Sequence, residues 1–247
     1  MKLNVHEFGQ GSVRGLWLHG WMGSGREGDD LQKALGNAHA LCCPDLPGHG
    51  GTPLADWDLD ASLEAVASLA QNCDWAGGYS MGGRILMMAA NRYPDAFSQL
   101  VIESASLGLE NVNARETRKK VDHQRAEELI SRGLETFCET WYQMDMWGGF
   151  TDFPNREGDA VDLAGALELF SVAHQPDLRL WILNSSCRLL WLAGQKDPVY
   201  AAQADWVKQN TPHEVEIFDT GHNVHAQAKN AWGNTVCGVL KASDSGL

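Results

Sequence analysis

The stretch Gly77-Gly78-Tyr79-Ser80-Met81-Gly82-Gly83-Arg84 decides the fold that this chain can adopt. It contains the pattern Gly-x-Ser-x-Gly, which places a serine on a sharp turn between a strand and a helix. The apolar run over residues 73–78 predicts a short buried strand before the turn, and residues 84–93 predict a helix that ends at Pro94. This order indicates an α/β protein with the serine at one edge of its sheet.

The glycines of this stretch have a steric purpose. A turn this tight leaves no room for Cβ atoms beside Ser80, so Gly78 and Gly82 are expected there. The turn lifts the Ser80 hydroxyl above the carboxyl edge of the sheet. It also directs the N–H of Met81, at the start of the helix, toward an anion held beside the serine.

A second loop is expected beside the serine. His19-Gly20-Trp21 follows an apolar strand over residues 15–18, the usual position of the second N–H of an oxyanion hole, and we assign that donor to Trp21. We expect the His19 side chain to brace the loop. Asp45 and His49 lie in the Pro- and Gly-rich segment 44–50, which predicts a rigid turn rather than a catalytic pair.

Two residues further along the chain complete a catalytic group with Ser80. Asp197 stands just beyond an apolar strand and His222 follows the last strand, so both are expected at the same sheet edge. His222 then accepts the serine proton, and Asp197 orients and stabilises the imidazolium. His225 is the competing candidate for the base, but the small residues Thr220 and Gly221 before His222 favour His222 in that role. The two histidines lack further ligands at suitable spacing, so no metal site is predicted.

Composition narrows the class of protein. The 247 residues carry 19 basic and 32 acidic side chains, a net charge of −13, which argues against nucleic acid and anionic membranes as partners. The first ten residues have no apolar signal-peptide core, and no apolar run reaches membrane-spanning length. The six cysteines show no C-x-x-C spacing and are expected as free thiols. These features predict a cytoplasmic protein.

The chain is expected to form one α/β core with an insertion. Strand-like and helix-like segments alternate over residues 1–106 and 184–247, which predicts a mostly parallel central sheet with helices on both faces. Residues 107–183 instead look helical throughout, without a clear strand. Such an insertion is expected to form a cap over the carboxyl ends of the strands, where ligands of α/β proteins bind.

Along nearly its whole length the sequence resembles the 2-succinyl-6-hydroxy-2,4-cyclohexadiene-1-carboxylate synthases, enzymes of menaquinone biosynthesis with an α/β-hydrolase fold. The Gly-His-Asn-x-His run at residues 221–225 and the spacing within the cap are more specific than the serine motif. The motifs that carry the resemblance are residues 19–24, 45–50, 78–84, 104–109, 114–126, 175–178, 194–197 and 221–225. The sequence departs from the family pattern in three places: Val199 replaces a common lysine, Leu107 replaces a common proline, and the family's third cap arginine has no clean counterpart.

The resemblance implies a carbon–oxygen lyase that needs no cofactor. Its substrate is a small polycarboxylate, 2-succinyl-5-enolpyruvyl-6-hydroxy-3-cyclohexene-1-carboxylate, from which pyruvate is eliminated. Ser80, activated by His222 and Asp197, is then a base rather than a covalent nucleophile. The Trp21 and Met81 N–H groups are expected to stabilise an enolate oxygen.

Arginines are implied as the carboxylate-binding groups, because a planar guanidinium suits a carboxylate. Arg84 lies one helical turn beyond the serine, and Arg118 lies on the first cap helix. Arg156 is placed about where the family has a third arginine. Tyr142 and Trp147 are expected to line the cavity.

Two other functions remain open from the sequence. The same serine, acid and histidine also suit a carboxylesterase or a C–C bond hydrolase of a carboxylated substrate. A non-catalytic ligand receptor on this fold is the third possibility, and the intact Ser80, Asp197 and His222 set argues against it. The sequence does not indicate an oligomeric state.

Overall fold

The computed structural model describes residues 2–154 and 156–244. Its described strands form one sheet in the order β1-β3-β2-β4-β5-β6-β7, in which β1 is antiparallel to β3 and the other pairs are parallel. The strands are β1 (Val5–Phe8), β2 (Val13–Leu18), β3 (His39–Pro44), β4 (Trp75–Tyr79), β5 (Gln99–Glu103), β6 (Arg188–Gly194) and β7 (Glu214–Phe218). The predicted mostly parallel sheet is therefore confirmed.

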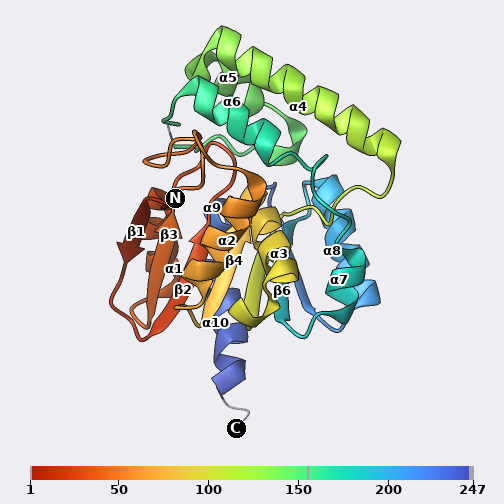
Figure 1. Ribbon diagram of the computed structural model, residues 1–247. Helices are drawn as coiled ribbons and strands as arrows, with labels where there is room; N and C mark the ends of the chain where they lie inside the picture. The colour runs from red at the N-terminus through yellow and green to blue at the C-terminus, as the bar shows by residue number, and fades with distance from the viewer. Residues whose placement is uncertain (1, 155, 245–247) are drawn as a thin grey trace.

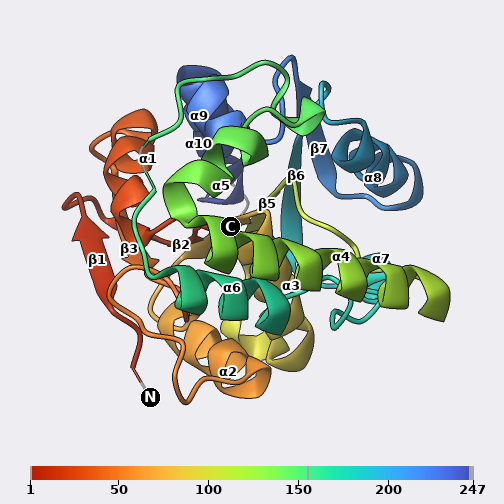
Figure 2. The same ribbon diagram turned by 90° about the horizontal axis from the view of Figure 1, so that it is seen from above.

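The helices cover both faces of this sheet (Figures 1 and 2). The core helices are α1 (Gly28–Leu35), α2 (Leu59–Ala70), α3 (Met81–Arg92), α8 (Pro198–Asn210), α9 (Val224–Gln227) and α10 (Lys229–Asp244), with the short helices η1 (Gly25–Glu27) and η2 (Pro94–Ala96). The helix after the serine begins at Met81, three residues earlier than predicted, because the turn consists of Ser80 alone.

Alternation along the strands divides the apolar residues between the two faces. In β2, Leu16 and Leu18 pack in the cluster beneath α2, α3 and α8, whereas Trp17 points to the opposite face. There it joins Trp232 of α10, with ring centroids 5.3 Å apart. This alternation is the period-two pattern of a strand buried on both sides.

Four of the described helices between β5 and β6 lie across the carboxyl ends of the strands, as Figures 1 and 2 show. They are α4 (Val112–Arg132), α5 (Leu134–Trp141), η3 (Asp145–Trp147) and α6 (Ala160–Leu169). Side chains of Asn111 and Asp159 accept hydrogen bonds from the first N–H groups of α4 and α6 and so mark where these helices begin. None of the described helices is long and apolar enough to cross a membrane.

Helix α7 (Arg179–Asn184), at the end of the segment that the sequence places in the cap, packs differently from α4 to α6. It lies beside α8 (Figure 1), where the Arg179 guanidinium carbon is 5.8 Å from the Trp206 ring centroid. His213 Nε2 donates to Ile182 O at 3.1 Å. The segment that overlies the strand ends thus comprises α4, α5, η3 and α6, and we call these four helices the cap.

Candidate active site

The turn that carries Ser80 is strained and enclosed by backbone. Ser80 adopts a φ of 52°, which a residue with a side chain rarely does, and its N–H donates to Glu103 O at 2.8 Å. A Cβ at Gly78 would lie 2.7 Å from Gly82 C, and one at Gly82 only 2.3 Å from Leu18 O. Both glycines are therefore required by close backbone approach, as the sequence predicted.

Ser80, His222 and Asp197 come together at the carboxyl edge of the sheet. The Nδ1 of His222 donates to Asp197 Oδ2 at 2.7 Å, which leaves Nε2 to accept the Ser80 hydroxyl at 2.9 Å. His222 and Asp197 are 2% and 1% exposed. The hydrogen bond to Asp197 orients the imidazole so that its lone pair faces the serine, which is the arrangement a base requires.

Aromatic rings surround His222. Its ring centroid lies 5.5 Å from Trp147, 5.2 Å from Tyr79 and 4.6 Å from Tyr200. Burial raises the pKa of the Tyr200 hydroxyl, and the nearby Arg118 and Arg84 oppose that rise. Sequence reasoning missed Tyr79 and Tyr200, although each lies within three residues of a predicted catalytic residue.

The loop that follows β2 is held from below by two buried histidines. His19 Nδ1 donates to Gly20 O at 2.7 Å, and its Nε2 accepts Leu46 N at 3.0 Å. His49 Nε2 accepts the N–H of Met22, whose φ is 61°. The expected bracing role of His19 and the expected rigid turn around His49 are confirmed. From above, Trp21 Nε1 donates to Leu163 O in α6 at 2.8 Å.

Acid should weaken this loop first. Burial, together with the neighbouring His19, lowers the pKa of His49 to about 3. Below about pH 6.5, His49 binds a proton in the unfolded chain, whereas it stays neutral in the folded protein down to about pH 3. Each pH unit in this range therefore lowers the free energy of unfolding by roughly 1 kcal/mol. The two ring nitrogens of His49 accept the Met22 N–H and donate to Pro47 O, and His49→Gln supplies one acceptor and one donor of the same kind without titrating. We expect its urea midpoint to fall less steeply between pH 6.5 and 4 than that of the wild type; equal slopes would contradict this.

Arg84 is a buried cation beside the serine. Its side chain is 6% exposed, and Nη1 donates to Phe170 O at 2.6 Å. Among the described residues no carboxylate lies within ion-pair distance of it. Burial lowers the pKa of Arg84 to about 10, so the group remains charged at neutral pH. A buried cation without a carboxylate in ion-pair contact is costly, which makes the site receptive to an anion.

Arg118 extends from α4 toward the same region. Its Nε donates to Asp122 Oδ2 at 2.7 Å, and the buried Asp122 also accepts Ser171 Oγ at 2.7 Å and lies 3.5 Å from Arg125 Nη1. Asp122 therefore holds one edge of the Arg118 guanidinium. The two Nη groups of Arg118 have no protein partner in the described part of the chain.

Arg156 does not lie free in the site. It forms an ion pair with Glu27 and its Nε donates to the Tyr142 hydroxyl at 2.6 Å. Tyr142 stacks on Phe153 with ring centroids 3.9 Å apart. Trp147, by contrast, touches His222 directly, and the backbone beside it accepts the His222 N–H at Met146 O, 2.8 Å away. Substrate binding by Arg156 and Tyr142 remains a prediction.

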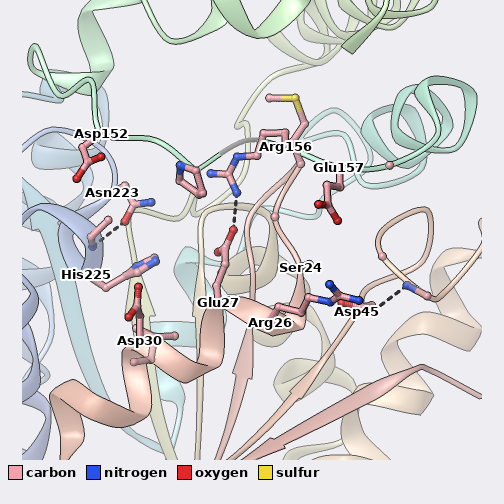
Figure 3. A pocket seen from close by; sticks show the side chains of 18 of the residues that line it. Ser24, Arg26, Glu27, Asp30, Asp45, Asp152, Arg156, Glu157, Asn223 and His225 are labelled. Carbon is pink, nitrogen blue, oxygen red and sulfur yellow. Dashed lines mark hydrogen bonds and ion pairs between the residues drawn. The ribbon is translucent and has the colours of Figure 1, made fainter. Parts of the chain in front are cut away.

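A separate cavity of about 840 Å³ opens next to the site (Figure 3). Glu27, Arg156 and His225 contribute to its wall, but Ser80 and His222 do not. Ser80 and His222 therefore lie outside the wall of this cavity. No cluster of three or more His, Cys, Asp or Glu side chains among the described residues is placed as a metal site would be.

Sequence comparison identifies relatives of this chain. The profile of the alpha/beta hydrolase family matches residues 16–231. A 2-succinyl-6-hydroxy-2,4-cyclohexadiene-1-carboxylate synthase of Escherichia coli O1:K1 / APEC is 30% identical over 226 residues, which cover 86% of this chain and 87% of the relative. The synthase of the same name from Escherichia coli O157:H7 is 30% identical over 224 residues, with the same coverage.

Solved structures share the fold. MenH from S. aureus superposes with a TM-score of 0.90 at 21% identity, covering 99% of this chain and 100% of that one. A thermophilic esterase from Thermogutta terrifontis reaches a TM-score of 0.70 at 21% identity, covering 97% and 93% of the two chains. From the matched profile and the synthase relatives we conclude that this chain belongs to the α/β hydrolase family and, within it, to the family of the 2-succinyl-6-hydroxy-2,4-cyclohexadiene-1-carboxylate synthases.

Proposed function

We propose that this chain is a carbon–oxygen lyase which eliminates pyruvate from 2-succinyl-5-enolpyruvyl-6-hydroxy-3-cyclohexene-1-carboxylate and forms 2-succinyl-6-hydroxy-2,4-cyclohexadiene-1-carboxylate in menaquinone biosynthesis. The observation that carries the proposal is the buried Arg84 guanidinium beside Ser80, which has no carboxylate partner in the described part of the protein. A carboxylated substrate supplies the missing countercharge. An ester without a carboxylate would leave this cation unpaired.

Ser80 acts as the base in this proposal. His222 takes the hydroxyl proton of Ser80 as the serine oxygen removes the ring proton beside the succinyl ketone. The electron pair of that C–H bond forms an enolate. It then returns through the ring, the double bond shifts, and the C–O bond to the enolpyruvyl group breaks. The leaving group is the enolate of pyruvate, which accepts the proton held by the His222 imidazolium. Ser80 Oγ keeps the ring proton, so both enzyme groups return to their starting state.

The enolate oxygen needs hydrogen-bond donors during this step. The backbone N–H of Trp21 lies in the loop after β2 and that of Met81 at the first residue of α3, and neither has a partner among the described residues. Donors fixed before the reaction stabilise developing charge without reorganisation. The adjoining residues are held by hydrogen bonds, from Ser80 N to Glu103 O at 2.8 Å and from Met22 N to His49 Nε2 at 3.1 Å.

Arg118 is proposed to bind a carboxylate farther from the reacting carbons. We expect Arg118→Ala to raise KM roughly ten-fold with a smaller change in kcat, because a charge-assisted hydrogen bond contributes about 1.5–3 kcal/mol. Arg118→Lys should recover part of the loss, since it retains the charge but not the fork. Arg132→Ala is the matched control, because Arg132 lies on the same helix and pairs with Glu128 at the surface. An unchanged KM for Arg118→Ala would remove Arg118 from the site.

A base-only role for Ser80 excludes a covalent intermediate. With the native substrate we expect no adduct on Ser80 at any time from milliseconds to steady state, measured by rapid quench and mass spectrometry of the intact protein. An activated ester serves as the positive control for trapping an acyl group. A substrate-derived mass on Ser80 would favour a hydrolase mechanism instead.

Pyruvate release decides between the lyase and the alternative hydrolases. Pyruvate can be followed through the NADH consumed by added lactate dehydrogenase, with a p-nitrophenyl ester assayed in parallel on the same preparation. The proposal expects rapid pyruvate release and slow ester hydrolysis. Efficient ester hydrolysis without pyruvate release would identify an esterase, and no turnover of either compound would favour the non-catalytic receptor.

A further inference from the structure

A second carboxylate–histidine pair lies directly behind the Ser80 site. Glu103, the last residue of β5, is fully buried. Its Oε1 accepts three hydrogen bonds, from Val224 N at 2.8 Å, His225 N at 3.2 Å and His225 Nδ1 at 2.8 Å. The proposed elimination uses neither Glu103 nor His225.

Glu103 is also connected to the serine. Its backbone oxygen accepts the Ser80 N–H at 2.8 Å, and it pairs with Tyr79 in the neighbouring strand β4. One residue therefore holds the turn of Ser80 through its main chain and the start of α9 through its side chain. These two segments carry the two atoms, Ser80 Oγ and His222 Nε2, between which the proton moves.

The segment from Val224 to His225 determines where His222 lies, because it follows His222 after a single residue. The His225 ring fits among aromatic rings, 5.6 Å from Trp17 and 5.0 Å from Tyr79 between centroids. Tyr79 also contacts His222, at 5.2 Å. A shift of His225 would therefore reach His222 both through the chain and through the Tyr79 ring.

The buried charge explains the strength of this attachment. A carboxylate in an apolar interior is strongly unfavourable, and the three N–H donors compensate it at Oε1 alone, because Oε2 is buried without a hydrogen-bond partner among the described residues. The loop that carries His222 is consequently restricted to one arrangement, because any other arrangement would remove the N–H donors from the buried carboxylate. The hydrogen bonds of the Glu103 side chain to described residues all go to Val224 and His225.

We propose that Glu103 is a positioning residue: with His225 as its partner, it ties the loop of the proposed base His222 to the strand that follows the Ser80 turn. His225 is then neither a second base nor a metal ligand. The proposal rests on the proposed roles of Ser80 and His222, but not on the identity of the substrate. It gives a function to the second histidine of the Gly-His-Asn-x-His run.

Two variants test this role. Glu103→Gln retains an acceptor at Oε1 but loses the charge, and His225→Phe retains a ring among Trp17 and Tyr79 but loses the donor. Since a displacement of about 1 Å costs on the order of 100-fold in rate, we expect Glu103→Gln to lower kcat roughly 10- to 100-fold and His225→Phe roughly 10-fold. KM should stay within about two-fold for both, because the arginines are untouched.

A spectroscopic measurement separates positioning from general loss of stability and needs no substrate. The His222 Nδ1 proton that binds Asp197 should give a low-field proton NMR signal, assigned by its loss in His222→Gln. We expect this signal to shift or broaden in Glu103→Gln and His225→Phe. Val66→Ala, a core substitution in α2 far along the chain from these residues, is the control for lowered thermal stability and should leave both signal and kcat near the wild-type values.

The outcomes are distinct. An unchanged kcat and an unchanged signal in folded Glu103→Gln and His225→Phe would overturn the proposal, as would equal changes in Val66→Ala. If Glu103→Gln fails to fold, His225→Phe alone decides. If the wild type releases no pyruvate, the proposed lyase function fails, and the NMR signal together with labelling of Ser80 by a sulfonyl fluoride still tests the positioning role.

Discussion

Ser80→Ala and His222→Ala should each lower the rate of pyruvate release by a factor on the order of 10⁴ or more, with the fold retained. The serine oxygen is the proposed base, and His222 Nε2, 2.9 Å away, is the proposed acceptor of its proton. The two groups carry out one proton transfer, so removing either one is expected to cost about as much rate as removing both. Steady-state pyruvate release measures the loss, and circular dichroism with a thermal midpoint shows that each variant is folded.

His225→Ala is the informative comparison for the base assignment. The His225 Nδ1 faces Glu103, 2.8 Å away, rather than Ser80. We therefore expect a smaller loss than for His222→Ala, in keeping with an indirect role. A loss equal to that of His222→Ala at the same thermal stability would mean that the base has been assigned to the wrong histidine.

Arg84→Ala should have the second largest effect, a fall of roughly 100-fold in kcat/KM with kcat lowered as well. A charge-assisted hydrogen bond contributes about 1.5–3 kcal/mol, and an oriented reactant adds to this. Arg84 lies one turn beyond Ser80, where its bond to the substrate would orient the ring that loses the proton. The net charge of −13 repels a polyanionic substrate, so this local cation is also needed for attraction.

Arg84→Lys distinguishes charge from geometry. Lysine restores the positive charge but not the planar pair of donors, so we expect partial recovery of kcat/KM and little recovery of kcat. Thermal midpoints must accompany the kinetics, because losing the bond to Phe170 O leaves that carbonyl unpaired. If Arg84→Ala had wild-type kinetics, Arg84 would not bind a substrate carboxylate, and the proposed function would lose its main support.

Much of the fold follows from local sequence patterns. The glycines around Ser80 are dictated by the close approach of the backbone, since a Cβ added at Gly82 would lie only 2.3 Å from Leu18 O. The apolar runs of β2 and of β4 to β6 specify strands, and the chain order then brings Ser80, Asp197 and His222 to one sheet edge. Parallel strands share that edge, so no tertiary detail was needed to predict this meeting.

The boundaries and the partners of single side chains were decided by tertiary structure. The sequence assigns α7 to the inserted segment, yet Arg179 and Ile182 pack it beside α8. A helix of six residues has too few positions for its pattern to show which surface it covers. Packing against a distant part of the chain settles its place.

The same holds for the chemistry around the serine. The sequence by itself determined which residues carry the predicted base and acid, because short motifs with local geometry specify them. Only the tertiary structure paired Arg156 with Glu27, 129 residues apart, placed Tyr200 on His222, and joined Glu103 to His225, 122 residues apart. These contacts depend on how distant helices and strands pack against one another and on the side-chain rotamers at those places. The spacing of residues within a single segment specifies neither of them.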